Sequence, residues 1–70
     1  MVARKIFFVN GKKYETYNSF TIDQLLSYFN YKQTLFIIEY NNLICDQKYW
    51  PKLEIKNKDK IEIVTIVGGG

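Results

Sequence analysis

A chain of 70 residues is near the lower limit at which a domain folds without disulfides or metals, so we expect one domain with a small core, built from a composition that is 47% hydrophobic and 17% aromatic. The single cysteine, Cys45, excludes an internal disulfide, and the lack of histidine removes the usual zinc ligand and the usual base of Ser-His and Cys-His nucleophiles. The net charge of +3 is compatible with acidic partners, and no apolar run approaches the length of a membrane span, which indicates a soluble intracellular protein.

A hairpin is predicted at the start of the chain. Arg4–Val9 is apolar on consecutive positions, as in a covered strand, whereas Lys12–Tyr17 alternates, as in a more exposed one. Between them stands Asn10-Gly11, the strongest short-range hairpin signal, because a type I′ turn needs positive φ at both central residues.

One helix is predicted over Phe20–Asn30. Thr21 and Gln24 have the spacing of a capping box, in which each side chain accepts a hydrogen bond from the backbone N–H of the other residue. Asn30 is a plausible left-handed end of the helix. The residues at positions i, i+3, i+4 and i+7 form one apolar stripe for packing on a sheet: Ile22, Leu25, Leu26 and Phe29.

Two strands and a turn are predicted next. Leu35–Tyr40 and Leu43–Cys45 read as strands, separated by a tight turn. Trp50 is expected to close one end of the core. Cys45 is expected to be a small buried hydrophobe rather than a reactive thiol.

The last strand, Lys60–Val67, is rich in β-branched residues and leads to three glycines, Gly68–Gly70. Its near-continuous apolar character predicts a central strand that is covered on both faces for much of its length. The glycines are compatible with two roles: a bare, flexible end that enters a narrow channel and presents an ionised α-carboxylate, or a frayed tail without a function. By themselves they favour the frayed tail.

The order strand, strand, helix, strand, strand, strand predicts an α+β fold of two layers. One helix covers only one face of a sheet, and a right-handed crossover makes the first and last strands parallel neighbours. We therefore expect a ubiquitin-like β-grasp, with a mixed sheet of four to five strands packed on one main helix. The β-grasp domain is expected to span residues 1–67, followed by a flexible tail at 68–70.

The sequence resembles the ThiS family of sulfur carriers from thiamine biosynthesis over nearly its whole length. The resemblance is carried by Val9–Lys12, Thr21–Leu26, Ile37–Asn41 and, most specifically, Ile61–Gly70. The chain departs from the family before the last strand, where Asn57-Lys58-Asp59 has a lysine in place of a common glycine.

The resemblance implies that the carboxylate of Gly70 is the reactive group. A ThiF-like adenylating enzyme activates it with ATP and magnesium, and a persulfide sulfur from a cysteine desulfurase pathway then displaces AMP to leave a thiocarboxylate. A ThiG-like thiazole synthase takes the sulfur. Gly68 and Gly69 allow the tail to thread into the partner, and Ile66 and Val67 are candidates for contact at the channel mouth.

The resemblance also implies a reusable co-substrate rather than an enzyme. The chain is expected to bind no cofactor or metal itself, to be a monomer when free, and to have neither a nucleic acid nor a membrane as partner. The expected compartment is the bacterial cytoplasm or the plastid stroma.

Three other functions remain open from the sequence. A MoaD-like carrier for molybdopterin shares the fold and the terminal glycines, and a ubiquitin-like protein modifier uses the same activated carboxylate. A TGS-type β-grasp module that binds nucleic acid would need a basic patch with aromatic residues. Lys12, Lys13, Tyr14 and Tyr17 are a faint form of that pattern.

Overall fold

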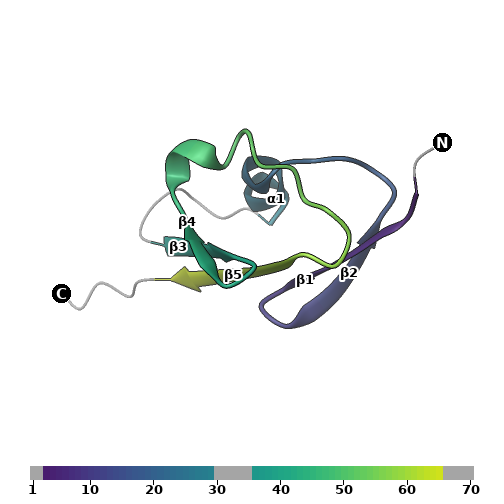
Figure 1. Cartoon of the computed structure of the whole chain (residues 1–70), viewed down its shortest axis with the longest axis horizontal. Helices are drawn as coiled ribbons and strands as arrows, with labels where there is room; N and C mark the ends of the chain where they lie inside the picture. The colour runs from purple at the N-terminus through teal and green to yellow at the C-terminus, as the bar shows by residue number, and fades with distance from the viewer. Residues whose placement is uncertain (1–2, 30–35, 66–70) are drawn as a thin grey trace.

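The computed structural model describes residues 3–29 and 36–65 (Figure 1). In chain order the elements are β1 (Lys5–Val9), β2 (Lys12–Thr16), α1 (Ile22–Tyr28), β3 (Phe36–Tyr40), β4 (Leu43–Cys45), the 3₁₀ turn η1 (Gln47–Tyr49) and β5 (Lys60–Thr65). Within these two ranges, no helix has the length and apolar character needed to cross a membrane.

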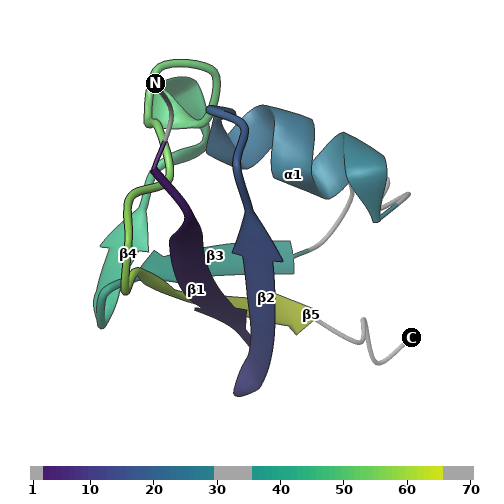
Figure 2. The ribbon, with the colours of Figure 1, turned by 90° about the vertical axis from the view of Figure 1, so that its right-hand side faces the viewer.

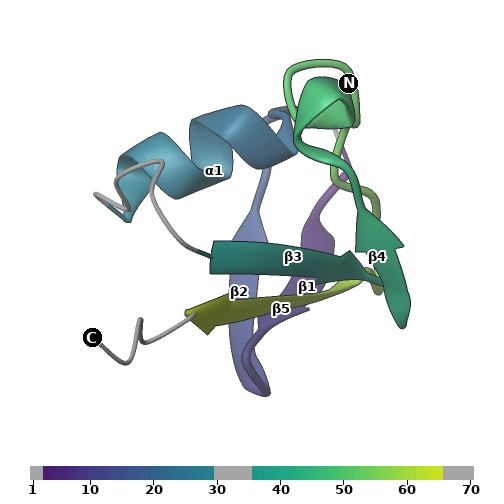
Figure 3. The same ribbon diagram turned by 90° about the vertical axis from the view of Figure 1, so that its left-hand side faces the viewer.

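The five strands form one mixed sheet in the order β2-β1-β5-β3-β4. β1 and β5 are parallel, and the other neighbouring strands are antiparallel. α1 lies across one face of this sheet (Figures 2 and 3). The predicted β-grasp is confirmed, including the parallel placement of the first and last strands at the centre.

The hairpin between β1 and β2 forms at the predicted turn. Asn10 and Gly11 both have positive φ, 50° and 80°, as a type I′ turn requires. The strands pair from Val9 opposite Lys12 at the turn to Lys5 opposite Thr16 at the other end.

The helix has the predicted capping box but is shorter than predicted, starting at Ile22 and ending at Tyr28. Thr21 is the N-cap, its side chain accepts the N–H of Gln24, and the Gln24 side chain accepts the N–H of Thr21 at 2.9 Å, which completes the capping box. The helix ends at Tyr28, because Phe29 has already left helical geometry with φ −86° and ψ 2°. Asn30, the predicted left-handed end, lies outside the described residues.

The core lies between α1 and the sheet. The predicted stripe is confirmed, because Ile22, Leu25 and Leu26 are buried and Phe29 packs against them partly buried. Trp50 is also buried and stacks on Phe36 with ring centroids 5.3 Å apart, so its predicted position at the core is confirmed. The buried apolar side chains are Phe7, Val9, Ile22, Leu25, Leu26, Ile38, Trp50, Ile55, Ile61 and Ile63.

The prediction that the last strand is covered on both faces is wrong. Ile61 and Ile63 are buried against α1, whereas Glu62 and Val64, which point to the other side of the sheet, are exposed. The single α-helix of the described residues covers one face of the sheet and leaves the other open. The consecutive apolar residues of β5 therefore lie alternately on the buried face and on the exposed face of the sheet, and only the first of these faces packs in a core.

Candidate functional site

The residues predicted to carry the function follow β5 directly. Ile66, Val67 and the three glycines Gly68–Gly70 lie outside the described residues, as does the predicted domain boundary after residue 67. β5 is the described strand that leads to these residues.

On one side, β5 is held by β3 along its whole length. Five residue pairs join the two strands, from Ile61 opposite Tyr40 to Thr65 opposite Phe36. At the start of β5 the backbone N–H of Asn41 donates to the Lys60 carbonyl, and the Lys60 N–H donates to Asn41 Oδ1, both at 2.8 Å. These two bonds fix the register of β5 against the β3–β4 turn.

On the other side, the pairing with β1 is short and a side chain extends it. Only two pairs join β1 and β5, and β1 then turns away at Asn10. The N–H of Asn10 donates to the Ile61 carbonyl at 2.9 Å, and Asn10 Oδ1 accepts the N–H of Ile63 at 2.7 Å. The side chain of Asn10 thus supplies the hydrogen-bond acceptor that a further residue of β1 would otherwise supply to β5. The sequence predicted its turn conformation but not this second role.

The turn that precedes β5 keeps a glycine-like backbone without glycine. Lys58 has φ 72°, a left-handed conformation that favours glycine. The N–H of Lys58 donates to the Ile6 carbonyl, and Asn57 Oδ1 accepts the N–H of Ile6 at 2.8 Å. These bonds to β1 hold the turn in place although a lysine occupies the position.

Asp59 is the buried polar centre of this turn, with 7% of its surface exposed. Its carboxylate accepts hydrogen bonds from the Tyr40 hydroxyl, from Asn41 Nδ2 at 3.2 Å and from the backbone N–H of Lys56 at 2.7 Å. Burial, and then the hydrogen bond to Asp59, raise the pKa of Tyr40 well above its ordinary value. Apart from the polar character of the turn, no pattern in the sequence indicates this cluster.

The open face of the sheet forms an apolar surface beside β5, which we call the outer face. By register its apolar members are Ile6, Phe8, Ile37, Ile44 and Val64, and its charged members are Lys13, Glu15, Glu39, Lys60 and Glu62. Ile44 and Val64 are the most exposed of its apolar members, at 75% and 45%. An exposed apolar patch with polar residues beside it is typical of a surface that binds another protein.

Two carboxylates stand opposite each other on the outer face. Glu39 on β3 pairs with Glu62 on β5, next to the pair of Tyr40 and Ile61 at the end of the ladder. Like charges directly opposite on neighbouring strands destabilise a sheet. A cationic group of a bound partner would relieve this repulsion, so the pair favours a partner with a basic residue at this position.

Cys45 is half-buried rather than fully buried. Burial, and then the nearby carboxylate of Asp46, raise the pKa of its thiol. Because the thiolate is the nucleophilic form, this thiol is a poor nucleophile at neutral pH. The surroundings of Cys45 thus agree with the structural role expected from the sequence.

Comparison with known proteins places these features in one family. The profile of the ThiS family matches residues 7–70. The protein called ycf40 of Trieres chinensis is 54% identical over 66 residues, covering 94% of this chain and 90% of that protein. The protein of the same name from Porphyra purpurea is 31% identical over 62 residues, covering 89% and 87%. The crystal structure of the thiamine biosynthesis protein ThiS from Geobacter metallireducens superposes with a TM-score of 0.78 and 25% identity, over 93% of this chain and 99% of that one.

Proposed function

The chain belongs to the ThiS family of ubiquitin-like sulfur carriers, and on this premise we propose that Gly70 carries sulfur for thiazole formation in thiamine biosynthesis. The observation that carries the proposal is the family match itself, which runs through residue 70 and so includes the terminal glycines. The placement of β5 at the centre of the sheet supports it, because a strand bonded on both sides gives the residues that follow a defined starting point.

The proposed chemistry takes place at the α-carboxylate of Gly70. A carboxylate oxygen attacks the α-phosphorus of ATP, pyrophosphate leaves, and an acyl adenylate forms. A persulfide sulfur on a partner enzyme then attacks the carbonyl carbon and AMP leaves. A second thiol of the partner breaks the sulfur–sulfur bond, so the partner ends as a disulfide and the carrier as a thiocarboxylate. AMP is needed because a free carboxylate is a poor acyl donor.

The partners in this proposal are a ThiF-like adenylating enzyme, a cysteine desulfurase as the sulfur source and a ThiG-like thiazole synthase as the acceptor. ATP and magnesium belong to the adenylating enzyme, and this chain acts as a reusable co-substrate. The relatives named ycf40 favour the plastid stroma as the compartment, because ycf names designate plastid reading frames.

The outer face is the proposed docking surface for the adenylating enzyme. Val64 lies on it only one residue before Thr65, the last described residue, so a partner that binds this face is also next to the start of the tail. Glu39 and Glu62 would accept hydrogen bonds from a basic side chain of that partner. In the tail, Gly68 and Gly69 would thread into the partner channel, with Ile66 and Val67 at its mouth.

The proposal is tested by intact-protein mass spectrometry. The chain is incubated with a ThiF-like enzyme, a cysteine desulfurase, cysteine, ATP and magnesium, and we expect its mass to rise by one oxygen-to-sulfur exchange. Transfer to thiazole synthase, with return of the original mass, separates the thiazole pathway from the molybdopterin pathway.

Three variants serve as controls in this assay. Deletion of Gly70, or addition of a residue after it, is expected to abolish the mass shift and leave the circular dichroism spectrum unchanged. Cys45→Ala is expected to retain the shift. A shift that survives the deletion of Gly70, or that is lost in a folded Cys45→Ala protein, would place the sulfur chemistry elsewhere.

A further inference from the structure

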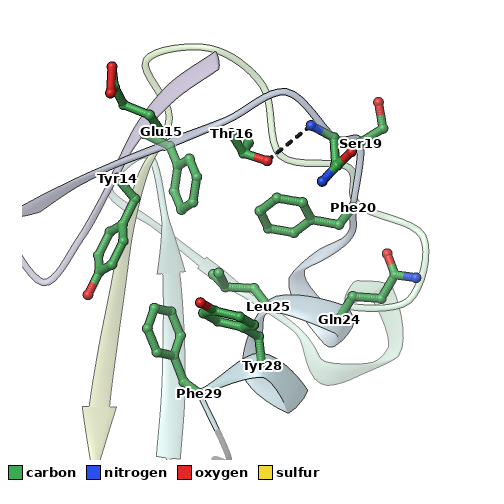
Figure 4. Close-up of a pocket in the computed structure, with 11 residues that line it drawn as sticks. Tyr14, Glu15, Thr16, Ser19, Phe20, Gln24, Leu25, Tyr28 and Phe29 are labelled. Atoms are coloured by element: carbon green, nitrogen blue, oxygen red, sulfur yellow. Dashed lines mark hydrogen bonds between the residues drawn. The ribbon is translucent and has the colours of Figure 1, made fainter. Parts of the chain in front are cut away.

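A cavity of about 490 Å³ opens between β2 and α1, two strands away from β5 (Figure 4). Phe7 and Leu25, both buried, lie at its base. Its other apolar lining residues are the aromatic side chains Tyr14, Phe20, Tyr28 and Phe29. A volume of this size is within the range of ligand-binding sites, about 300–1,000 Å³.

The aromatic rings of the cavity hold each other in position. Phe7 stacks on Tyr14 with centroids 5.7 Å apart and meets Phe20 edge-on at 5.6 Å. Tyr14 meets Phe29 edge-on at 5.4 Å. Tyr28 meets Phe29 edge-on at 5.4 Å but is 79% exposed at the opening of the cavity. The cavity therefore has rigid apolar walls and one aromatic side chain available to a ligand.

Four polar side chains that line the cavity are bonded within the protein: those of Glu15, Thr16, Ser19 and Gln24. Gln24 completes the capping box, and Thr16 Oγ1 accepts the backbone N–H of Asn18 at 3.0 Å. The carboxylate of Glu15 pairs with Arg4 at 3.2 Å. Most of these side-chain groups are therefore engaged, and further groups that can orient a ligand are found in the backbone beside the cavity.

The backbone of β2 provides such groups next to the cavity. β2 is the last strand on its side of the sheet. In a two-residue hairpin the residues flanking the turn, here Val9 and Lys12, form a hydrogen-bonded pair. Because bonded and non-bonded pairs alternate, the backbone groups of Lys13 and Glu15 point away from β1, toward the open edge.

We propose that β2 binds an extended acidic segment of a partner protein, which adds to the sheet as a sixth strand and places one apolar side chain in the cavity. Side chains of paired residues lie on the same face of a sheet, so the residue opposite Tyr14 projects on the side of α1, where the cavity opens. Peptides that add to a sheet edge gain affinity from the backbone bonds and specificity from such pockets.

The charge of the edge defines the chemistry of the segment. Lys12 and Lys13 are both exposed, at the end of β2 next to the turn, and the chain carries a net charge of +3. Aspartate or glutamate residues at one end of the bound segment would lie beside these two lysines. The segment therefore combines an acidic end with an apolar or aromatic residue.

A second copy of this chain fits the edge less well. In an antiparallel two-fold pairing of β2 with itself, the residue opposite Tyr14 is Lys12, Tyr14 or Thr16, depending on the register. Lys12 and Thr16 are not apolar, and the ring of Tyr14 is stacked on its own Phe7. A separate peptide side chain has no such restraint.

The proposed site leaves β5 free. β1 lies between β2 and β5, so one partner can hold β2 while another binds the outer face and the tail. The binding inference does not depend on sulfur transfer, because its test measures binding alone.

Binding is tested by fluorescence anisotropy with a fluorescein-labelled peptide of two aspartates followed by alternating threonine and phenylalanine. Lys13→Pro removes an outward N–H and leaves the bonds to β1 in place, so we expect about tenfold weaker binding than in Lys13→Gln, which removes only the charge. Tyr28→Ala is expected to weaken binding, whereas Tyr49→Ala, at an exposed tyrosine on η1, is not.

A second measurement covers the case in which Lys13→Pro fails to fold. Peptides are methylated on alternate backbone nitrogens, and only the set whose N–H groups face β2 is expected to lose binding to the unchanged protein. Equal binding by both sets, or equal binding by Lys13→Pro and Lys13→Gln, would overturn the proposal. Self-association in sedimentation equilibrium that Lys13→Pro abolishes would also overturn it, in favour of a second copy.

Discussion

The two faces of β5 differ in their side chains and in their environment. On the inner face Ile61 and Ile63 are buried under α1, whereas on the outer face Val64 is 45% exposed and Glu62 faces Glu39. The inner face holds the strand, because each fully buried aliphatic side chain contributes about 1.5–3 kcal/mol. The outer face contributes little to stability and leaves apolar surface for a partner. β5 therefore anchors the end of the chain in the core with one face and offers apolar surface to a partner with the other.

The largest expected effect comes from the inner face. Ile61→Ala leaves a cavity at a fully buried position and is expected to lower the free energy of unfolding by about 2–5 kcal/mol, as measured by urea denaturation. Val64→Ala on the outer face is expected to change it by no more than about 0.5 kcal/mol. Equal losses in the two variants would mean that the outer face is also packed.

A smaller loss is expected at the turn that starts β5. Asp59→Ala removes the acceptor of three hydrogen bonds, including that of Tyr40, and is expected to cost about 1.5–3 kcal/mol in the same measurement. Asp46→Ala also removes a carboxylate, one that accepts a single hydrogen bond from the N–H of Lys48 at an exposed position, and is expected to cost less, about 1 kcal/mol. If both variants lowered the free energy of unfolding by the same small amount, Asp59 would not be the centre of the turn.

The outer face is tested by its effect on activation rather than on folding. Val64→Asp is expected to raise the KM of the adenylating enzyme for this chain about tenfold, which corresponds to roughly 1.4 kcal/mol of lost binding, with little change in urea midpoint. Tyr28→Asp, at an exposed residue of α1 on the opposite side of the sheet, is expected to leave the KM unchanged. An unchanged KM in Val64→Asp would move the docking surface away from this face.

The smallest effect is a pH dependence at Tyr40. Its pKa is raised in the folded state by burial and by Asp59, so the stabilisation from the neutral hydroxyl is complete below the unfolded pKa of about 10 and decreases as the pH rises further. Tyr40→Phe is expected to be less stable than the unchanged protein at pH 7 by about 1 kcal/mol. Urea denaturation between pH 7 and pH 11 should show this difference narrowing above pH 10, and a constant difference would contradict the assignment.

Local patterns were sufficient for much of the fold. The turn at Asn10-Gly11, the capping box of Thr21 and Gln24 and the apolar stripe of α1 each depend on residues a few positions apart. The resemblance of the last ten residues to a family then led to Gly70 as the candidate site. Its geometry stays a prediction, because Gly70 lies outside the described residues.

The sequence by itself determined the order and type of the elements, because hydrophobic period and turn chemistry act over short distances. Only the tertiary structure decided which face of β5 is buried, because one helix covers whichever side it packs against. It also decided the bond from Ile63 to Asn10 and the burial of Asp59 beside Tyr40, which join residues 53 and 19 positions apart. The cavity between β2 and α1 was likewise decided by the tertiary structure, because no local sequence pattern indicates which distant segments lie side by side.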